Sequence, residues 1–212
     1  MSAQSLKHYQ IKFQKSKRNK KYLLLNVFNP MKKHLHINIV IILGSLAFSQ
    51  DLQSLVNKAN NKIKSSDLVS AENILQDVLD TDPSFAPARI AFSKIWLRKG
   101  DLSKANEYAT LAVRIDEDFR PWWENLNEIK SGMQDGQKYI QQSNFDEAFQ
   151  EYESITKKYP YFSNAYYYMG IAKYKQRDVQ AAALFFEKAL KIYPDYQKAK
   201  KALKNVKKRL PK

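Results

Sequence analysis

The residue types that most often carry catalysis or bind metal ions are scarce in this chain of 212 residues. Its three histidines, His8, His34 and His36, all lie within the first fifty residues, and it contains no cysteine. The remaining sequence therefore lacks the groups for a Ser-His-Asp triad, a Cys-His pair or the common zinc sites. We expect no enzyme activity, no cofactor and no metal site.

Carboxylates remain as candidate acid–base groups, because paired Asp or Glu residues can hydrolyse glycosidic bonds. The candidates Asp80, Asp82, Asp116, Glu117 and Asp118 fall where helices are expected to end. Capping and solvation explain carboxylates at such positions. Because the sequence has neither a GxGxxG nor a GxxxxGK[ST] motif, we expect no phosphate-binding loop.

The formal charge of +15 is concentrated at the two ends of the chain. Residues 1–50 contain nine Lys or Arg and no acid, and residues 195–212 contain eight against the single Asp195. The body, residues 51–194, has 19 basic and 20 acidic residues, a net charge of −1. A basic surface spread over the fold is therefore missing, and we expect no nucleic-acid partner.

Residues 31–49 have the pattern of a secretory signal peptide. Lys32 and Lys33 precede a mostly apolar run over 37–48, which as a helix would cover ~18 Å of a ~30 Å bilayer core. Ala47 and Ser49 then provide small residues two apart, as at a cleavage site. We expect cleavage after Ser49 and export to the periplasm or the extracellular space.

Two alternatives to this interpretation stay open. Residues 37–48 would act as an uncleaved anchor behind a basic arm, or they would form a buried element of the fold. The lysine-rich residues 1–30 show no periodic face, and we expect translation to start at Met31, which would place them outside the native product.

The rest of the chain repeats one pattern four times. Each copy has a polar residue, then Asp or Asn, then an apolar residue, and an alanine three residues later, at Ala71, Ala105, Ala148 and Ala182, which are 34, 43 and 34 residues apart. Another small or β-branched residue follows seven positions on, at Val78, Ala112, Ile155 and Ala189. The Asp or Asn would cap a helix, and the small residues mark where a second helix crosses it.

This pattern resembles the tetratricopeptide repeat, a helix-turn-helix unit of about 34 residues. The resemblance covers Leu52 to Pro194 and implies an all-α fold, a right-handed α-solenoid of four repeats with a C-terminal capping helix. The repeats would be 52–85, 86–119, 129–162 and 163–194, with an insertion at 120–128 and a basic capping helix at 195–212. The pattern departs from the family at Lys58, Lys62, Ser93 and Glu117.

The insertion is expected to lengthen the first helix of the third repeat. Trp122, Leu126, Ile129 and Met133 would form one apolar stripe. We expect Trp122 in the core, whereas Trp123 is either an exposed contact or packed at an edge. Gly132 and Gly136 would permit close approach to the preceding hairpin.

The capping helix would place Ala199, Leu203, Val206 and Leu210 on one face. An end repeat needs such a cover with a polar outer side. The lysines on that outer side leave a second role open, which is docking on anionic lipid or on an acidic partner.

The resemblance implies a non-catalytic module that binds a peptide or protein, with an acidic segment favoured, in its concave groove. We expect an exported scaffold or assembly factor; the alternative is a membrane-anchored adaptor held by residues 37–48 and the basic C-terminal helix. The family's carboxylate clamp is not matched, since Val56 and Ala91 stand at two of its places. The binding residues that the inner positions imply are Ile90, Lys94, Leu97, Arg98, Met133, Gln137, Tyr167, Ile171, Tyr174 and Lys175.

Overall fold

The computed structural model describes residues 47–210. The chain divides into two compact units, residues 1–51 and residues 52–212, which are treated separately below. In the first unit only residues 47–51 are described, and they are helical and exposed. The expected extension 1–30 and residues 31–46 of the expected signal peptide lie outside the described residues.

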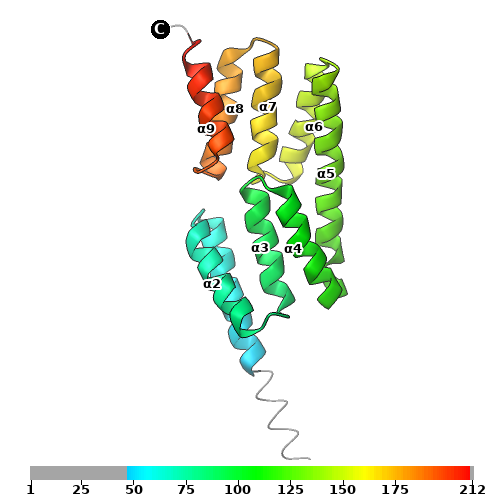
Figure 1. Cartoon of the computed structure of the whole chain (residues 1–212), viewed down its shortest axis with the longest axis vertical. Helices are drawn as coiled ribbons and strands as arrows, with labels where there is room; N and C mark the ends of the chain where they lie inside the picture. The colour runs from blue at the N-terminus through cyan, green and yellow to red at the C-terminus, as the bar shows by residue number, and fades with distance from the viewer. Residues whose placement is uncertain (1–46, 211–212) are drawn as a thin grey trace, which may run out of the picture. The chain divides into compact units, whose positions relative to one another are not determined.

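Every regular element in the described part of the second unit is helical (Figure 1). The unit begins with a helix over residues 52–64, here called the first helix. The elements that follow are α2 Leu68–Thr81, α3 Ala86–Arg98, α4 Leu102–Ile115, the 3-10 turn Glu117–Phe119, α5 Arg120–Gln141, α6 Phe145–Lys158, α7 Ser163–Lys175, α8 Val179–Ile192 and α9 Gln197–Lys207. Consecutive helices pack in antiparallel pairs, as in a tetratricopeptide-type solenoid, so the predicted all-α fold is confirmed.

The four hairpins turn in the same way. The residue before each cap has a positive φ, 64° at Ser66, 83° at Gly100, 62° at Ser143 and 64° at Arg177. The next residue is Asp or Asn, and in three hairpins its carboxylate accepts a hydrogen bond from a backbone N–H three residues on, at Ser70, Lys104 and Ala181. These bonds satisfy N–H groups that the helix itself leaves free, which fixes where the second helix of each pair begins.

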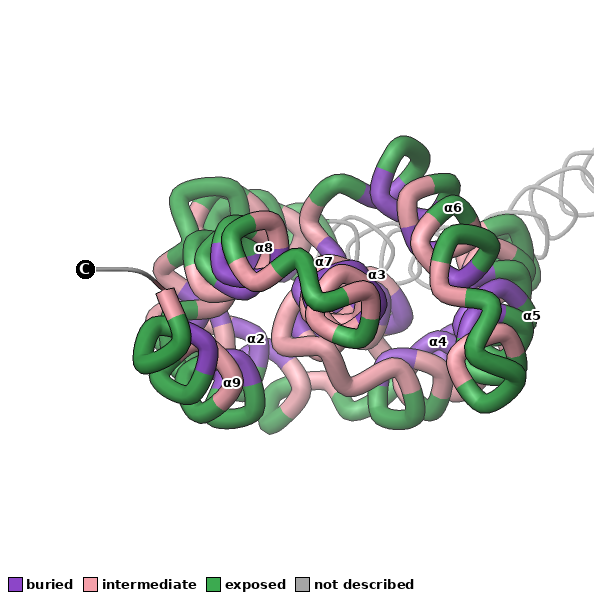
Figure 2. The backbone as a smooth tube through the Cα atoms, turned by 90° about the horizontal axis from the view of Figure 1, so that it is seen from above, coloured by how far each residue is buried: buried purple, intermediate pink, exposed green. Residues whose placement is uncertain are grey.

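The small residues of the repeat lie where the helices cross. Ala71, Ala105, Ala148 and Ala182 are completely buried, and so are Val78, Ala112 and Ala189. A larger side chain at a crossing would hold the two backbones apart. Figure 2 shows the same arrangement from above, with buried residues on the sides where helices meet and exposed residues on the outer sides.

The inserted residues make α5 the longest of these helices, 22 residues or about 33 Å. Two tryptophans at its start fix it to the second repeat. The Trp122 indole donates to Ser93 Oγ (2.8 Å), and the Ser93 hydroxyl donates to the Ala105 carbonyl (2.7 Å). The Trp123 indole donates to Thr110 Oγ1 (3.1 Å). Trp122 was predicted in the core but is only partly buried at the edge of two clusters, where its indole N–H reaches Ser93. Of the two alternatives for Trp123 the structure shows edge packing.

The two glycines of α5 permit a close helix contact, but the predicted packing partner was wrong. Gly132 and Gly136 approach α6, the following helix, and not the preceding hairpin. A Cβ atom at Gly136 would lie 2.5 Å from ring atoms of Tyr152. The preceding hairpin is instead contacted by the N-terminal half of α5 through its tryptophans, so the C-terminal half is free to pack on α6.

The extension of α5 displaces the last two repeats along the axis of α5 relative to the first two, an arrangement called here the step in the array. The C-terminal end of α3 meets the N-terminal end of α7, and the two helices lie end to end in Figures 1 and 2. A Cβ atom at Gly100, just after α3, would lie 3.0 Å from Ser163 Oγ at the start of α7. The first two repeats and the last two therefore follow one another along α5.

The last helix closes the apolar end of the array, as predicted. Ala199 and Val206 of α9 are buried, and Leu203 and Leu210 are partly buried against the same cluster. The residues that face away from this cluster are mostly lysines.

Substitution of Gly136 by alanine tests the close approach of α5 and α6. The new methyl group would overlap the Tyr152 ring, which is fully buried and stacked on Tyr168 with centroids 5.4 Å apart. We expect Gly136→Ala to lower the free energy of unfolding by about 1–3 kcal/mol, although alanine is the better helix former. Urea denaturation measures the change.

The matched control is Gln134→Ala, at an exposed position of the same helix, which should change stability by less than about 0.5 kcal/mol. A Gly136→Ala protein as stable as the wild type would contradict this contact.

Candidate functional site

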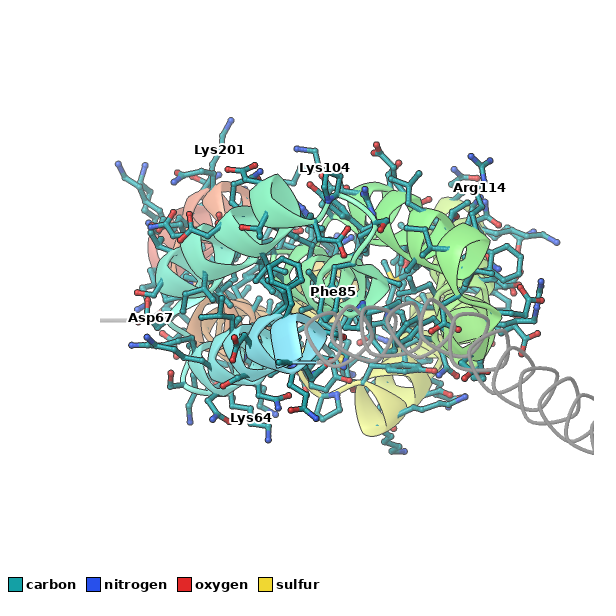
Figure 3. The ribbon with its side chains drawn as sticks, turned by 90° about the horizontal axis from the view of Figure 1, so that it is seen from below. Lys64, Asp67, Phe85, Lys104, Arg114 and Lys201 are labelled. Carbon is teal, nitrogen blue, oxygen red and sulfur yellow. The ribbon has the colours of Figure 1, made fainter. Side chains whose placement is uncertain are left out.

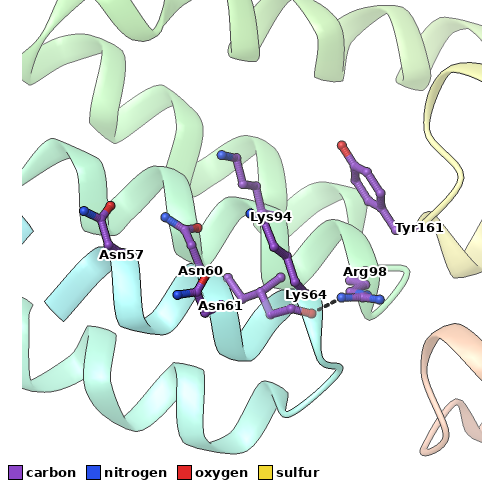
Figure 4. A pocket seen from close by; sticks show the side chains of 8 residues that line it. Asn57, Asn60, Asn61, Lys64, Lys94, Arg98 and Tyr161 are labelled. Carbon is purple, nitrogen blue, oxygen red and sulfur yellow. Dashed lines mark hydrogen bonds between the residues drawn. The ribbon is translucent and has the colours of Figure 1, made fainter. Parts of the chain in front are cut away.

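The larger of two candidate sites is a cavity of about 650 Å³ on the inner side of the first two repeats, here called the inner pocket (Figure 4). It lies between the first helix and α3, and the connection between α6 and α7 reaches it. Its lining residues are Asn57, Asn60, Asn61, Ile63, Lys64, Lys94, Arg98 and Tyr161.

Helix periodicity explains the amides of the inner pocket. Leu52, Val56, Ala59 and Ile63 form the buried stripe of the first helix. Asn57, Asn61 and Lys64 recur at the same spacing on another face and are exposed. Figure 4 shows the side chains of Asn57 and Asn60 directed toward the open side of the pocket, as is the amine of Lys94.

Lys94 is a half-buried cation that forms no ion pair with the described residues. Its ammonium lies 5.6 Å from the centroid of the Trp122 ring, which gives partial compensation. Burial lowers the pKa of Lys94 below its ordinary value, and the charge of Lys64 lowers it further. A ligand carboxylate would offset both effects.

Arg98 anchors the pocket wall. Its guanidinium donates to the Ile63 carbonyl, drawn as the dashed line in Figure 4, and to Ser66 Oγ (3.2 Å). These bonds satisfy a carbonyl at the end of the first helix. Burial lowers the pKa of Arg98, while Tyr161 acts in the opposite direction. Arg98 therefore positions the first helix against α3, and Lys94 and Lys64 are the cations left for a ligand.

Tyr161 reaches the inner pocket from the second half of the array, as Figure 4 shows. It lies in the connection between α6 and α7, and burial raises the pKa of its hydroxyl. Because α7 begins at the end of α3, this connection is held beside Arg98. The step in the array thus adds an aromatic wall to a pocket formed by the first two repeats.

The second candidate site is a cavity of about 280 Å³ between α7, α8 and α9, here called the tyrosine pocket. Its apolar walls come mainly from α7 and α8, and its rim is cationic. The lining residues are Tyr167, Ile171, Tyr174, Phe186, Lys198, Lys201, Ala202, Asn205 and Val206. It shares no lining residue with the inner pocket, so the inner side has two separate hollows.

The structure divides the predicted binding residues into three groups. Five of them line the cavities: Lys94 and Arg98 the inner pocket, and Tyr167, Ile171 and Tyr174 the tyrosine pocket. Gln137 and Lys175 are exposed outside both cavities, and Gln137 donates to the Tyr168 hydroxyl at 3.2 Å.

The remaining three, Ile90, Leu97 and Met133, are core residues, and we correct their assignment as contacts. Their exposed fractions are 6%, 0% and 8%. Ile90 packs near Trp122 at the start of α5, and Leu97 and Met133 belong to the central apolar cluster. The extended α5 packs on Ile90 and Leu97, which would face a groove in a regular array, and it turns its own Met133 into the same core.

Several lining residues were not predicted, namely Asn57, Asn61, Lys64, Lys198, Lys201 and Asn205. The sequence contained a signal for the first three, since they recur three and four residues apart opposite an apolar stripe. The last three belong to the capping helix, for which the resemblance implied only a cover.

No group of three or more His, Cys, Asp or Glu among the described residues is placed to hold a metal ion. Within residues 47–210, no helix is both long enough and apolar enough to cross a bilayer.

A comparison with protein families gives one match. Residues 135–197 match the family described as "Tetratricopeptide repeat". This segment, less than a third of the chain, is similar to tetratricopeptide repeats. The matched segment includes the C-terminal third of α5, all of α6, α7 and α8, and the first residue of α9. The match falls within the third and fourth predicted repeats and the start of the cap, and the count of four repeats stays a prediction.

Solved structures with these repeats are only distantly similar. The complex of the TPR2AB domain of yeast Sti1 with pHSP90 shares 16% identity over 74% of this chain and 70% of that chain, with a TM-score of 0.37. The repeat protein YrrB, titled as having an unusual peptide-binding site, shares 20% identity over 71% and 90%, with a TM-score of 0.36. PilF of Pseudomonas aeruginosa shares 18% identity over 74% and 69%, also at 0.36. Superpositions this poor support no conclusion about the site, and no curated protein matches the sequence.

Replacement of Lys94 by methionine tests the cost of its burial. Burial depresses the pKa of Lys94 in the folded state below its value in the unfolded chain. Keeping the amine charged at neutral pH therefore costs stability, and this cost falls as the pH rises and the folded protein releases the proton first. We expect Lys94→Met to raise the melting temperature at pH 7 by a few degrees. The gain should shrink as the pH rises toward the ordinary lysine pKa of 10.5.

Scanning calorimetry of both proteins at several pH values measures this difference. Lys130→Met, at an exposed position of α5, is the matched control and should show no such pH dependence. A destabilised Lys94→Met protein would show that the ammonium is already paired in the fold.

Proposed function

We propose that the protein is a non-catalytic binding module that holds an acidic segment of a peptide or protein in the inner pocket. The observation that carries this proposal is Lys94, a half-buried cation without a carboxylate partner among the described residues, beside three amides. Cations so placed are costly unless a partner offsets their desolvation. A ligand carboxylate would provide that partner as a charge-assisted hydrogen bond.

The asparagines allow the inner pocket to form hydrogen bonds with the backbone of a peptide ligand. Each side-chain amide both donates and accepts hydrogen bonds, as a peptide group does. Asn57, Asn60 and Asn61 lie within about one turn of the first helix and so present several such groups side by side. An extended acidic segment would use its backbone on the amides and a carboxylate on Lys94 or Lys64.

The tyrosine pocket is the proposed second contact. Tyr167 is in contact with Tyr168, Phe186 and Tyr196, with ring centroids 5.3 to 5.7 Å apart, so its ring is already ordered before any ligand binds. A large apolar side chain of the partner would fit the walls formed by Ile171 and Phe186. Ordered aromatic residues in such pockets commonly contribute most to affinity.

Selection of peptides tests the proposal. A display library of random dodecapeptides selected on the full chain should be enriched in Asp and Glu, and the selected peptides should bind less tightly as salt rises. Fluorescence anisotropy with such a peptide should show affinity at least about tenfold lower for Lys94→Met. Because that variant is expected to be the more stable protein, misfolding would not explain the loss.

Lys130→Met is the control and should bind the peptides as the wild type does. Enrichment of basic or neutral peptides, or equal affinity for Lys94→Met, would refute the inner pocket as an acidic site.

We further propose export through residues 31–49, which makes the protein a scaffold or assembly factor of the cell envelope or exterior. The alternative proposal is a membrane-anchored adaptor that keeps residues 37–48. N-terminal sequencing of the protein from its host separates the two: a mature chain beginning at Gln50 is expected. A chain that retains residues 37–48 would favour the anchored form.

A further inference from the structure

The capping helix carries far more positive charge than the rest of the array. Residues 195–212 have a net charge of +7, while residues 51–194 have a net charge of −1. A cap needs only a polar outer side to keep the end of the array soluble. Uncharged or mixed-charge residues would serve, so capping alone leaves this concentration of lysine unexplained.

The geometry of α9 places lysines opposite its packed side. Ala199, Leu203 and Val206 face the cluster on α8. Gln197, Lys201, Lys204 and Lys208 follow at i, i+4, i+7 and i+11 on the other side, and all four are exposed. We call Lys201, Lys204 and Lys208 the lysine stripe. Figure 3 shows Lys201 directed away from the helices into solvent.

Ion pairs neutralise the charges of two lysines next to the stripe but not those of the stripe itself. Lys200 pairs with Asp195 at 3.0 Å, and Lys207 pairs with Glu187 at 2.9 Å. Within residues 47–210, the three lysines of the stripe form no ion pair. Like charges three and four residues apart destabilise a helix, so the stripe is a cost to α9 that an anionic surface would remove.

We propose that the lysine stripe docks the protein on the surface of an anionic lipid bilayer. The stripe is straight and spans about 10 Å along one helix, and its three lysines are exposed, so a flat surface can meet all three at once. Lys201 also stands at the rim of the tyrosine pocket, where the stripe begins. Each lysine near such a surface adds to the attraction exerted by the anionic headgroups. This inference rests on α9 alone and does not depend on the inner pocket.

The chemistry of α9 favours lipid over nucleic acid. Single-stranded nucleic acids bind where aromatic rings stack on bases. Helix α9 itself contains no aromatic residue, and Tyr196 at its N-terminal end is buried and donates to Asn164. The apolar residues of α9 are already used in packing, so the helix would rest among the headgroups without inserting. Binding should therefore be electrostatic and sensitive to salt.

The absence of cysteine allows a test on the full chain that reports on α9 itself. A fluorescent donor is attached to Gln197→Cys, on the same face of α9 as the stripe, or to Gln150→Cys on α6, both exposed positions. Vesicles contain equal parts phosphatidylglycerol and phosphatidylcholine, with an acceptor on a fraction of the headgroups. We expect stronger energy transfer from residue 197 than from residue 150, and its loss at about 0.5 M salt.

Charge reversal completes the test. In the double variant Lys204→Glu, Lys208→Glu, the vesicle concentration that gives half-maximal transfer from residue 197 should rise about tenfold or more. The double variant Lys130→Glu, Lys138→Glu, which makes an equal charge change on α5, should leave this concentration unchanged. Equal transfer from both labels would mean that another segment tethers the chain and would overturn the proposal. So would binding of a single-stranded oligonucleotide that depends on Lys204 and Lys208 while no lipid transfer is seen.

Discussion

Close contact between paired helices is the constraint on which the rest of the structure depends. At each crossing the chain places an alanine with no exposed surface, from Ala71 to Ala182, at spacings of 34, 43 and 34 residues. Each hairpin leaves one side apolar, so that it is stable only against its neighbours. The capping bonds at Asp67, Asp101 and Asp178 set where the second helices start, and the buried alanines set how closely they approach. Function is left to the residues that this packing does not use.

The extended α5 modifies this regular scheme. Trp122, Ser93 and the Ala105 carbonyl form a chain of hydrogen bonds that joins α5, α3 and α4, and the serine that departs from the repeat pattern is the residue that makes it possible. The extension places α7 at the end of α3, which brings Tyr161 to the inner pocket. One insertion therefore accounts for two separate cavities where a regular array would be expected to offer one groove.

The sequence predicted the helices well because its signals are local: the recurring alanines, the Asp or Asn that caps each second helix, and the prolines that end most of these helices. It predicted Lys94 and Arg98 at a cavity, but it also placed Ile90, Leu97 and Met133 there. Ile90 is buried against the start of α5, and Leu97 and Met133, the latter on α5 itself, are buried in the central cluster. No local pattern reports where a lengthened helix will lie. Asn57 and Asn61 were detectable in principle, since they recur opposite the apolar stripe of the first helix. Residues 31–46 lie outside the described residues, so the larger part of the export signal stays a prediction.

Amide hydrogen exchange along α5 is the most direct measurement of the central claim, that one continuous helix packed through small residues holds the two halves of the array together. Leu126, Ile129 and Met133 occupy the middle of α5 and are buried in the central cluster. Their amides should exchange as slowly as those around Ala105 and Ala148, with no break between residues 126 and 137. Fast exchange there, comparable to that of the ends of the described chain, would contradict the account.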